Sequence, residues 1–291
     1  MIVSFHPCFG ADKYIICAGR KPDAADLAAV KAADAVILPQ GCNEVLYNMA
    51  SQNCSNIFPD YEAKFKYPGK IGQIRLFRET NVLHPKSVTF ERVDSFLDNY
   101  GAESENLPFD FPFVFKFDWG GEGYGVFLIT SPEEFKDAIQ NALNFERAGH
   151  VGFLIQEYIP SQNRSLRVVV IGQKFISYWR VQKNTEEFCS SLAKGAYLDF
   201  DSDPDLQEAA VKSTKHFCKM TGINLAGFDF LFSSEAVIKE PFFLEINYYF
   251  GRRGLGGSEK YYKILESEIN KWVYSLGLYE NEKKQFKAIC I

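Results

Sequence analysis

The sequence lacks the features that mark secreted, membrane-spanning or zinc-binding proteins. Its seven cysteines are scattered and form no Cys-x-x-Cys pair, which disfavours a zinc site or a disulfide framework. No apolar run approaches the roughly 20 residues of a membrane-spanning helix. Residues 1–20 have neither the basic leader nor the apolar core of a secretion signal. These absences predict a soluble, cytoplasmic protein that does not bind membranes.

An excess of basic residues is also missing. The chain has 32 Lys and Arg residues against 37 Asp and Glu residues, which gives a net charge of −5. Aromatic residues make up 15% of the sequence and could provide stacking surfaces for bases. Nucleic-acid binders combine such aromatics with a basic field, so we expect no nucleic-acid partner. A hydrophobic content of 46% is typical of a folded globular protein.

Motifs of several catalytic classes are absent as well. The chain contains no GxSxG or HExxH pattern, and its four histidines are isolated from one another. Its most glycine-rich stretch is not followed by the Lys-Ser or Lys-Thr pair of a Walker loop. Hydrolases that use a catalytic triad or a zinc ion are therefore disfavoured.

The residue patterns divide the chain into two parts. Segments 2–5, 23–33, 35–39 and 70–80 alternate between strand-like and helix-like patterns, which predicts a small α/β unit. From Pro108 onward strand patterns dominate, which predicts an α+β architecture of several lobes. Strands are expected at 113–118, 126–129, 153–157, 165–171, 174–180, 225–232 and 242–248. Helices are expected at 132–145, 205–221 and 259–276.

One expected strand places a lysine beside a glycine-rich hairpin. Phe113, Phe115 and Phe117 fall on one face of this strand, and Lys116 falls on the other. Four glycines follow within residues 120–125, and their backbone N–H groups could surround phosphate oxygens. A phosphate cradle and a mobile surface hairpin fit this segment equally well.

Oxygen-bearing side chains are predicted to meet on a second hairpin. Its turn is centred at Val237, so paired residue numbers sum to about 474 and Asp229 falls opposite Glu245. Asn247 shares the face of Glu245. The opposite face is expected to carry Leu244, Ile246 and Tyr248. Such oxygen ligands suit Mg²⁺ bound to nucleotide phosphates, and the alternative is a solvated sheet face.

Two further groups of residues could contribute to the same chemistry. Residues 153–160 are typical of an apolar strand that ends in a polar turn, where backbone groups could bond an adenine edge. Cations that could neutralise phosphate or hold a substrate carboxylate are Arg164, Arg167, Arg180, Lys194, Arg252 and Arg253.

Six motifs, taken in order, resemble the ATP-grasp superfamily and particularly its RimK-like and glutathione-synthetase-like ligases. They are Lys70 in Gly69-Lys-Ile-Gly-Gln-Ile-Arg-Leu-Phe, Lys116 before the glycine loop, Gln156-Glu157-Tyr158-Ile159, Ser165-Leu-Arg167, Gly227-Phe-Asp229 and Glu245-Ile-Asn247. The resemblance spans about residues 60 to 270. It implies an α/β N-terminal domain (1–90) followed by two α+β lobes that clamp ATP. These are a central lobe with a glycine-rich lid (91–160) and a C-terminal lobe with metal ligands (161–291).

The resemblance also implies roles for individual residues. Phosphate binding is implied for Lys70 and Lys116, and the lid for Gly120, Gly121, Gly123, Tyr124 and Gly125. The adenine hinge is implied to comprise Gln156, Glu157, Tyr158 and Ile159. The ligands of Mg²⁺, or of Mn²⁺ in its place, are implied to be Asp229, Glu245 and Asn247. We assign catalysis to Lys116, Arg167, Arg252 and Arg253.

The sequence departs from the family pattern at two places. No acidic residue for the ribose hydroxyls follows the hinge, so Ser165 or Gln162 is expected to take that role. The metal asparagine is followed by Tyr-Tyr-Phe-Gly-Arg-Arg-Gly, residues 248–254, instead of a Pro-Gly turn. Because this loop faces the acceptor in relatives, the departure leaves the identity of the substrate open.

The resemblance, together with these residues, implies an ATP- and Mg²⁺-dependent carboxylate–amine ligase. ATP would phosphorylate a carboxylate, and an amine of a small molecule or peptide would attack the acylphosphate to form an amide. A catalytic side-chain nucleophile is not required, which agrees with the missing triads. A small-molecule kinase on the same fold and a non-catalytic ATP-binding regulatory module are the alternatives.

The metal assignment can be tested by substitution. Asp229→Asn or Glu245→Gln is predicted to abolish turnover, because each replaces a negatively charged carboxylate ligand of the metal ion by a neutral amide. Neither substitution is predicted to disrupt the fold. Release of ADP measures turnover, and full activity in both variants would contradict the assignment.

Overall fold

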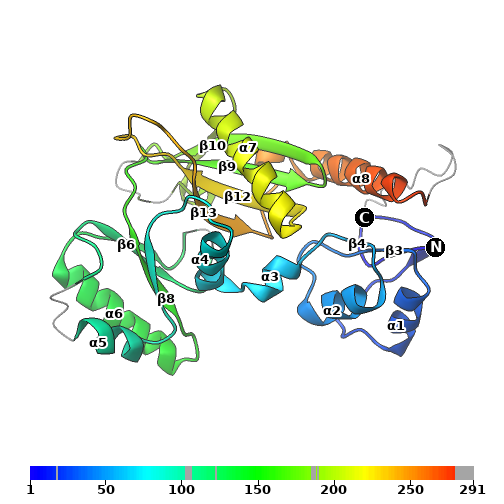
Figure 1. Cartoon of the computed structure of the whole chain (residues 1–291), viewed down its shortest axis with the longest axis horizontal. Coiled ribbons are helices and arrows are strands. Elements are labelled where there is room, and N and C mark those ends of the chain that lie inside the picture. The colour runs from blue at the N-terminus through cyan, green and yellow to red at the C-terminus, as the bar shows by residue number, and fades with distance from the viewer. Residues whose placement is uncertain (18, 102–106, 122, 185–187, 189, 279–291) are drawn as a thin grey trace.

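The structure is a mixed α/β architecture with one parallel sheet followed by two antiparallel sheets. The computed structural model describes residues 1–17, 19–101, 107–121, 123–184, 188 and 190–278. Within these ranges the strands form three sheets, which lie in separate parts of the molecule (Figure 1). The predicted α+β fold class is confirmed.

The first sheet is parallel and lies at the N-terminus of the chain. In the order β2-β1-β3-β4 its strands are β2 (Lys13–Tyr14), β1 (Ile2–Ser4), β3 (Ala35–Ile37) and β4 (Ile57–Phe58). Helix α1 (Ala24–Lys31) begins where the Asp23 side chain accepts hydrogen bonds from the next turn. Helix α2 (Glu44–Asn53) is capped in the same way by Asn43.

Two consecutive helices connect this sheet to the rest of the molecule. Helix α3 (Glu62–Lys66) leads into α4 (Gly69–Glu79), which lies against the edge strand β13 (Phe242–Asn247). The Gln73 side chain donates to the carbonyl of Ile246 at 2.9 Å and accepts from its N–H at 2.8 Å. These paired bonds satisfy backbone groups of an otherwise open sheet edge.

The central sheet is antiparallel and packs phenylalanines against its helices. In the order β5-β8-β6-β7 its strands are β5 (Ser87–Phe90), β8 (Phe153–Glu157), β6 (Phe113–Phe117) and β7 (Val126–Ile129). Helices α5 (Val93–Tyr100) and α6 (Pro132–Arg147) cover one face. Phe113, Phe115 and Phe117 all point into this core, as their spacing predicts.

The last sheet is antiparallel and follows in the sequence. In the order β11-β10-β9-β12-β13 its further strands are β11 (Tyr197–Asp199), β10 (Lys174–Val181), β9 (Arg164–Ile171) and β12 (Leu225–Leu231). Its helices are η1 (Leu192–Lys194), α7 (Pro204–Thr221), η2 (Arg253–Leu255) and α8 (Ser258–Ser275).

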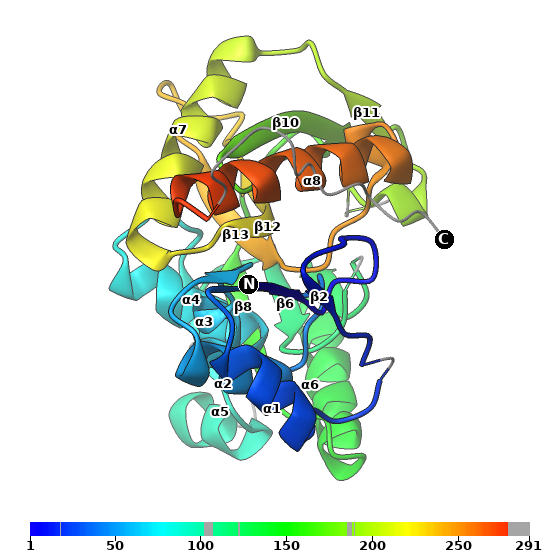
Figure 2. The ribbon, with the colours of Figure 1, turned by 90° about the vertical axis from the view of Figure 1, so that its right-hand side faces the viewer.

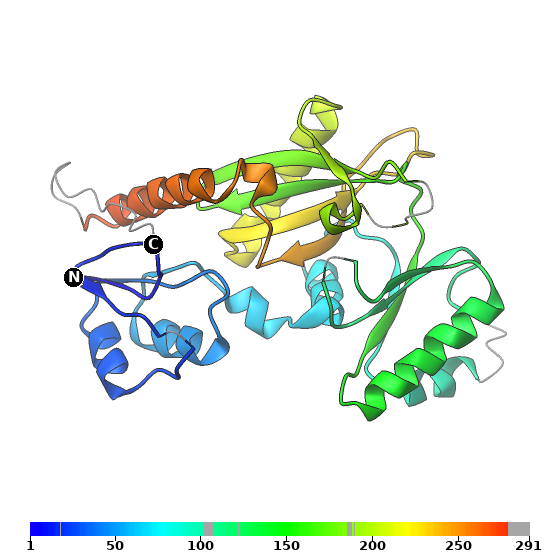
Figure 3. The same ribbon diagram turned by 180° about the vertical axis from the view of Figure 1, so that it is seen from behind.

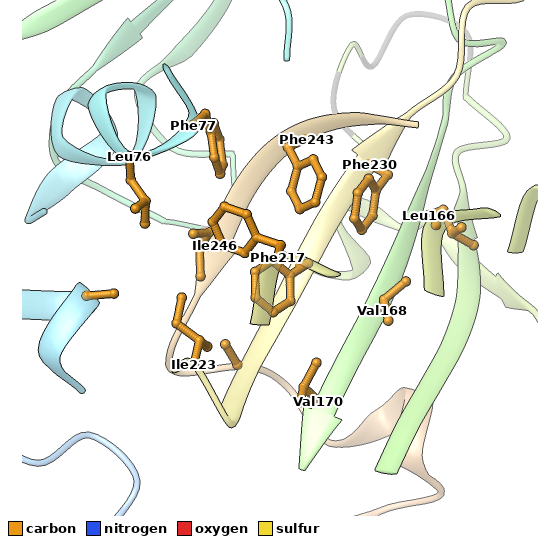
Figure 4. Packing of buried hydrophobic residues seen from close by; sticks show 14 of the residues in the cluster. Leu76, Phe77, Leu166, Val168, Val170, Phe217, Ile223, Phe230, Phe243 and Ile246 are labelled. Atoms are coloured by element: carbon orange, nitrogen blue, oxygen red, sulfur yellow. The ribbon is translucent and has the colours of Figure 1, made fainter. Parts of the chain in front are cut away.

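Both faces of this sheet are buried, by different parts of the chain. Residues of α4 and α7, including Phe77 and Phe217, pack on one face against Phe230 and Phe243 (Figure 4). Helix α8 and strands of the N-terminal sheet cover the other face, where Tyr261 is fully buried (Figure 2). Each buried aromatic or aliphatic side chain contributes about 2 kcal/mol. The N-terminal and C-terminal sheets therefore share one hydrophobic core.

The predicted elements from residue 113 onward occur at their expected places, with ends that differ by one or two residues. For example, α7 begins at Pro204, because the proline ring suits the first turn of a helix. Several short elements escaped prediction, namely β2, β4, β5, β11, α2, α3 and α5. In the described part of the chain, every helix is too short or too polar to cross a membrane.

His6 is a buried titratable group that follows β1. The residue is 4% exposed, and its Nδ1 atom accepts a hydrogen bond from the N–H of Cys8 at 3.1 Å. Burial, and then the nearby charge of Arg252, lowers the pKa of His6 from 6.5 to about 4. The folded protein therefore holds this imidazole neutral at pH values where the unfolded chain protonates it.

The fold is predicted to lose stability as the pH falls from about 6.5 towards about 4. The unfolded chain binds the proton first, so at pH 5 His6 alone lowers the free energy of unfolding by roughly 2 kcal/mol. Urea unfolding at pH 7.5 and pH 5 measures this loss of stability, which should be smaller in His6→Asn by the contribution of His6. His216→Asn, at an exposed position of α7, is the control and should lose as much stability as wild type. An equal loss in wild type and His6→Asn would contradict the prediction.

Candidate active site

A cavity of about 500 Å³ opens between the central sheet and the C-terminal sheet. Figure 3 shows the central sheet below one end of the C-terminal sheet. Residues from β6, β8, β9, β10, β12 and β13 line the cavity, together with the glycine-rich hairpin and the loop after β13. The volume is that of an ordinary small-molecule site.

The polar floor of the cavity is a row of side chains that crosses the C-terminal sheet. Asp229 on β12 pairs with Arg167 on β9 and with Glu245 on β13. Gly227 pairs with Asn247, so the amide lies on the same face one step further along β13. The predicted pairing of Asp229 with Glu245 is confirmed.

One prediction about this hairpin is wrong. A β-bulge shifts the register after Asp229, so that Phe230 pairs with Phe243. Phe243 and Ile246 therefore both point into the core, while Leu244 lines the cavity beside Glu245. The extra residue of the bulge reverses the alternation that the sequence predicted for Leu244.

The Asp229 carboxylate is buried and bound by two arginines. Arg167 donates from Nε at 2.7 Å and from Nη2 at 2.8 Å, and Arg180 on β10 approaches with Nη2 at 3.0 Å. Asn247 donates from Nδ2 at 3.1 Å. Burial would raise the pKa of Asp229, but the charges of Arg167 and then Arg180 outweigh it, so the pKa lies below its ordinary value.

The Arg180 guanidinium is the second cation at the Asp229 carboxylate. Its Nη2 atom also donates to Ser165 Oγ at 2.8 Å, and its buried Nε atom has no hydrogen-bond partner among the described residues. Burial lowers the pKa of this guanidinium, although Asp229 opposes the shift. The sequence placed Arg180 among the candidate cations but gave no reason to bring it to Asp229.

Two lysines approach the cavity from the central sheet and from α4. Lys116 on β6 is 7% exposed and donates to Oε1 of Gln156 at 2.7 Å. Lys70 donates to the carbonyl of Gly120 at 3.2 Å and lies 3.8 Å from Oε1 of Glu245. Lys70 therefore connects the base of the glycine-rich hairpin to the polar floor.

The glycine-rich hairpin needs glycine where its backbone folds back on itself. Gly120 has a φ of +91°, and a Cβ atom there would lie 2.8 Å from the carbonyl oxygen of Tyr124. Tyr124 is 63% exposed, and it lines the cavity with Gly121 and Gly123. Gly120 and Gly125 belong to the same hairpin but do not line the cavity.

The predicted hinge forms the far wall of the cavity. Gln156, Glu157, Tyr158 and Ile159 all line it, and Ser165 lies nearby at the start of β9. Four apolar side chains that the sequence did not assign to the site also line the cavity: Val114, Val126, Leu231 and Leu244. A flat apolar ring such as a purine would fit between such side chains.

The loop after β13 also lines the cavity. A Cβ atom on Gly254 would lie 2.1 Å from the Tyr178 ring, so glycine lets this loop pack directly on β10. The Arg252 guanidinium stacks 4.7 Å from the Tyr261 ring and 4.6 Å from the Tyr262 ring, which fixes it against α8. Arg252 and Arg253 both line the cavity.

Positive charge dominates the cavity although the whole chain is acidic. Among the described residues, seven cationic and three anionic side chains line it, an excess of four positive charges in a chain of net charge −5. The cations are Lys70, Lys116, Arg164, Arg167, Arg180, Arg252 and Arg253. Such an arrangement attracts a polyanion such as a triphosphate.

The donor set beside the arginines suits a divalent cation. Within the described ranges, no three His, Cys, Asp or Glu side chains form a metal-binding group. Glu245 supplies a partly exposed carboxylate, and Asn247 bonds Asp229 through Nδ2, which leaves its Oδ1 as a further oxygen donor. Asp229 supplies a second carboxylate, whose oxygens already accept from Arg167, Arg180 and Asn247. Mg²⁺ commonly takes few protein oxygens and shares the rest of its shell with phosphates and water.

The residues to which binding or catalysis was assigned line one cavity, except Gly120 and Gly125, and of the candidate cations only Lys194 does not line it. Of the two candidates for the ribose, Ser165 lines it and Gln162 does not. Their roles in binding and catalysis stay predictions.

A family model described as the RimK-like ATP-grasp domain matches residues 85–273 of the chain. This match covers the central and C-terminal sheets, together with most of α8.

Curated relatives match about half of the chain. A protein of Coxiella burnetii named "Probable alpha-L-glutamate ligase" is 29% identical over 146 residues, which is 50% of this chain and 44% of the relative. A "Probable alpha-L-glutamate ligase 2" of Shewanella sp. is 28% identical over 149 residues, 50% of this chain and 46% of the relative. The matched segment thus spans less than half the length of these relatives.

Solved structures share the fold at low sequence identity. A RimK domain ATP-grasp protein of Sphaerobacter thermophilus has a TM-score of 0.58 at 12% identity, covering 91% of this chain and 97% of the other. The VanG D-Ala:D-Ser ligase of Enterococcus faecalis has a TM-score of 0.58 at 18% identity, covering 83% and 73%.

The structure changes the expected effect of substituting Asp229. Asp229→Asn would leave two buried guanidinium groups without their carboxylate, so we expect the free energy of unfolding to fall by roughly 3–5 kcal/mol. Glu245, whose side chain is 30% exposed, is the matched control, and Glu245→Gln should change it by less than about 1 kcal/mol. Urea unfolding of both variants measures the difference, and equal losses would contradict this account.

Proposed function

Because the chain belongs to the family of RimK-like ATP-grasp domains, we propose that it is an ATP- and Mg²⁺-dependent ligase that joins a carboxylate to an amine. The observation that carries the proposal is one cavity in which cations, two carboxylates and an amide meet beside a glycine-rich hairpin. These are the groups that phosphoryl transfer from a nucleotide requires.

The nucleotide is proposed to lie along the cavity from the hinge to the polar floor. Its base would sit against the hinge and the apolar wall of Val114, Val126, Leu231 and Leu244. Its phosphates would extend towards Lys70, Lys116 and the N–H groups of the glycine-rich hairpin. The excess of positive charge supports this orientation.

The metal is proposed to be held by Asp229, Glu245 and Asn247. When bound there with the nucleotide, Mg²⁺ would neutralise negative charge on the phosphate oxygens. Arg167 and Arg180 both bond Asp229, so they are placed to bind oxygens of the phosphoryl group beside it.

The proposed reaction has two steps. A substrate carboxylate oxygen attacks the γ-phosphorus, the bond from that phosphorus to the bridging oxygen breaks, and ADP leaves. An amine nitrogen then attacks the acyl carbon, the bond from that carbon to the phosphate oxygen breaks, and phosphate leaves as the amine loses a proton. The protein supplies position, positive charge and, through the hairpin, exclusion of water.

The end of the cavity near Arg252 and Arg253 is proposed to hold the amine acceptor or the carboxylate substrate. Two guanidinium groups favour a substrate with its own negative charge. The relatives are named as glutamate ligases, and we propose glutamate as one of the two substrates.

Release of ADP tests the proposed reaction. The chain is incubated with Mg²⁺ and ATP, with glutamate and each of a set of amino acids, peptides and small carboxylates. At least one pair should release ADP and form an amide detectable by mass spectrometry. Lys116→Met should lower the rate by at least about 100-fold because it removes charge stabilisation at the phosphates. Lys136→Met, on an exposed position of α6, should keep wild-type activity.

The products separate this function from its alternatives. A phosphorylated hydroxyl compound without an amide would identify a kinase. Stabilisation by Mg²⁺ and ATP without ADP release from any pair would identify a non-catalytic binding module. Either outcome would overturn the ligase.

A further inference from the structure

The orientation of one buried amide, that of Gln156, follows from its two hydrogen-bond partners. Gln156 is 2% exposed, lies in the middle of the central sheet on β8 and lines the cavity. On one side its Oε1 atom accepts from Lys116 at 2.7 Å. On the other side its Nε2 atom donates to Ser87 Oγ at 2.8 Å. Rotation of the amide group can exchange the positions of its oxygen and its nitrogen, so the hydrogen-bond partners decide which atom faces Lys116.

Ser87 fixes the nitrogen end of the amide. Its hydroxyl donates to the carbonyl of Pro85 at 2.8 Å, and a carbonyl can only accept. The single hydroxyl proton is therefore committed, and Ser87 Oγ can offer Gln156 only a lone pair. Gln156 must present its NH₂ group to Ser87 and its oxygen to Lys116, which as an ammonium can only donate.

Ser87 is itself held firmly and lies outside the cavity lining. It is 7% exposed and pairs directly with Gln156 across β5 and β8. Its backbone carbonyl accepts a hydrogen bond from Arg78 of α4. Pro85, Ser87 and Gln156 thus form a chain of directed hydrogen bonds that ends in an acceptor at the cavity wall.

We infer that Ser87 is a positioning residue that makes the cavity select a 6-amino purine over a 6-oxo purine. This rests on the proposed binding of a nucleotide with its base at the hinge. The Gln156 oxygen has two lone pairs and Lys116 takes one, so the second can accept from the exocyclic amino group of adenine. A 6-oxo purine would present its own oxygen there, and two acceptors would face each other in a buried site.

The inference is tested with ATP and ITP, whose bases differ at position 6 and in the proton on the adjacent ring nitrogen. Their affinities are measured by calorimetry in Mg²⁺ without an acceptor substrate. Wild type should prefer ATP by about tenfold or more, the effect of one unsatisfied buried acceptor. Gln156→Leu removes the acceptor and should bring the two affinities within about threefold of each other. Ser87→Ala leaves the buried NH₂ group of Gln156 without its acceptor, so the amide is held at its oxygen end alone and the preference should fall at least about threefold.

Matched variants separate positioning from general damage to the sheet. Ser87→Thr keeps the hydroxyl and should retain the wild-type ratio of affinities. Thr89→Ala removes a hydroxyl two residues further along β5 and should also retain it. The unfolding temperature of each unliganded variant reports loss of stability, which by itself would weaken both nucleotides alike and leave the ratio unchanged.

The outcomes distinguish this inference from the proposed function. If wild type binds neither nucleotide, the proposed nucleotide site is wrong. If wild type prefers ATP and Ser87→Ala keeps that preference unchanged, the role of Ser87 is wrong and the nucleotide site stands. A wild type that binds ATP and ITP equally would overturn the inference in the same way.

Discussion

A single buried carboxylate, that of Asp229, ties together the strands that carry the cavity floor. It lies on β12 and bonds Arg167 on β9, Arg180 on β10 and Asn247 on β13. Isolated charges cannot be buried without partners, so these residues are stable only as a set. The register of the sheet places these residues side by side, because Asp229 pairs with Arg167 on one neighbouring strand and with Glu245 on the other. The polar floor is thus a property of strand pairing and not of any one motif.

The rest of the cavity is arranged relative to this floor by contacts that cross between sheets. Lys70 reaches from α4 to the carbonyl of Gly120 and towards Glu245. The central sheet places Lys116 by packing three phenylalanines on its other face against helices α5 and α6. These three aromatic rings therefore pack in the core and hold the polar face of the strand in place. By contrast, Tyr124 and Tyr249 are exposed and line the cavity.

Local pairings could be predicted from the sequence, and distant ones could not. The turn centred at Val237 was enough to set Asp229 opposite Glu245. A hairpin turn at Gly172 and Gln173, treated in the same way, would have set Ser165 opposite Arg180. Leu244 was placed on the wrong face because alternation cannot reveal a bulge. The role of Ser87 could not be predicted, because its partner Gln156 lies 69 residues away in the sequence. The two residues meet only because β5 pairs with β8 in the folded sheet.

The hydrophobic core shared by the N-terminal and C-terminal sheets has a consequence for how the protein can be divided. Ile2, Ile37 and Phe58 pack against the same layer as Tyr261 and Ile269 of α8. The segment that matches the family model begins at residue 85, so it leaves these N-terminal contributors behind. Expressed alone, that segment would expose the apolar side of α8 and of the sheet, and such surfaces drive aggregation. The family match thus begins inside the chain, whereas the hydrophobic cluster around α8 extends into the parallel sheet.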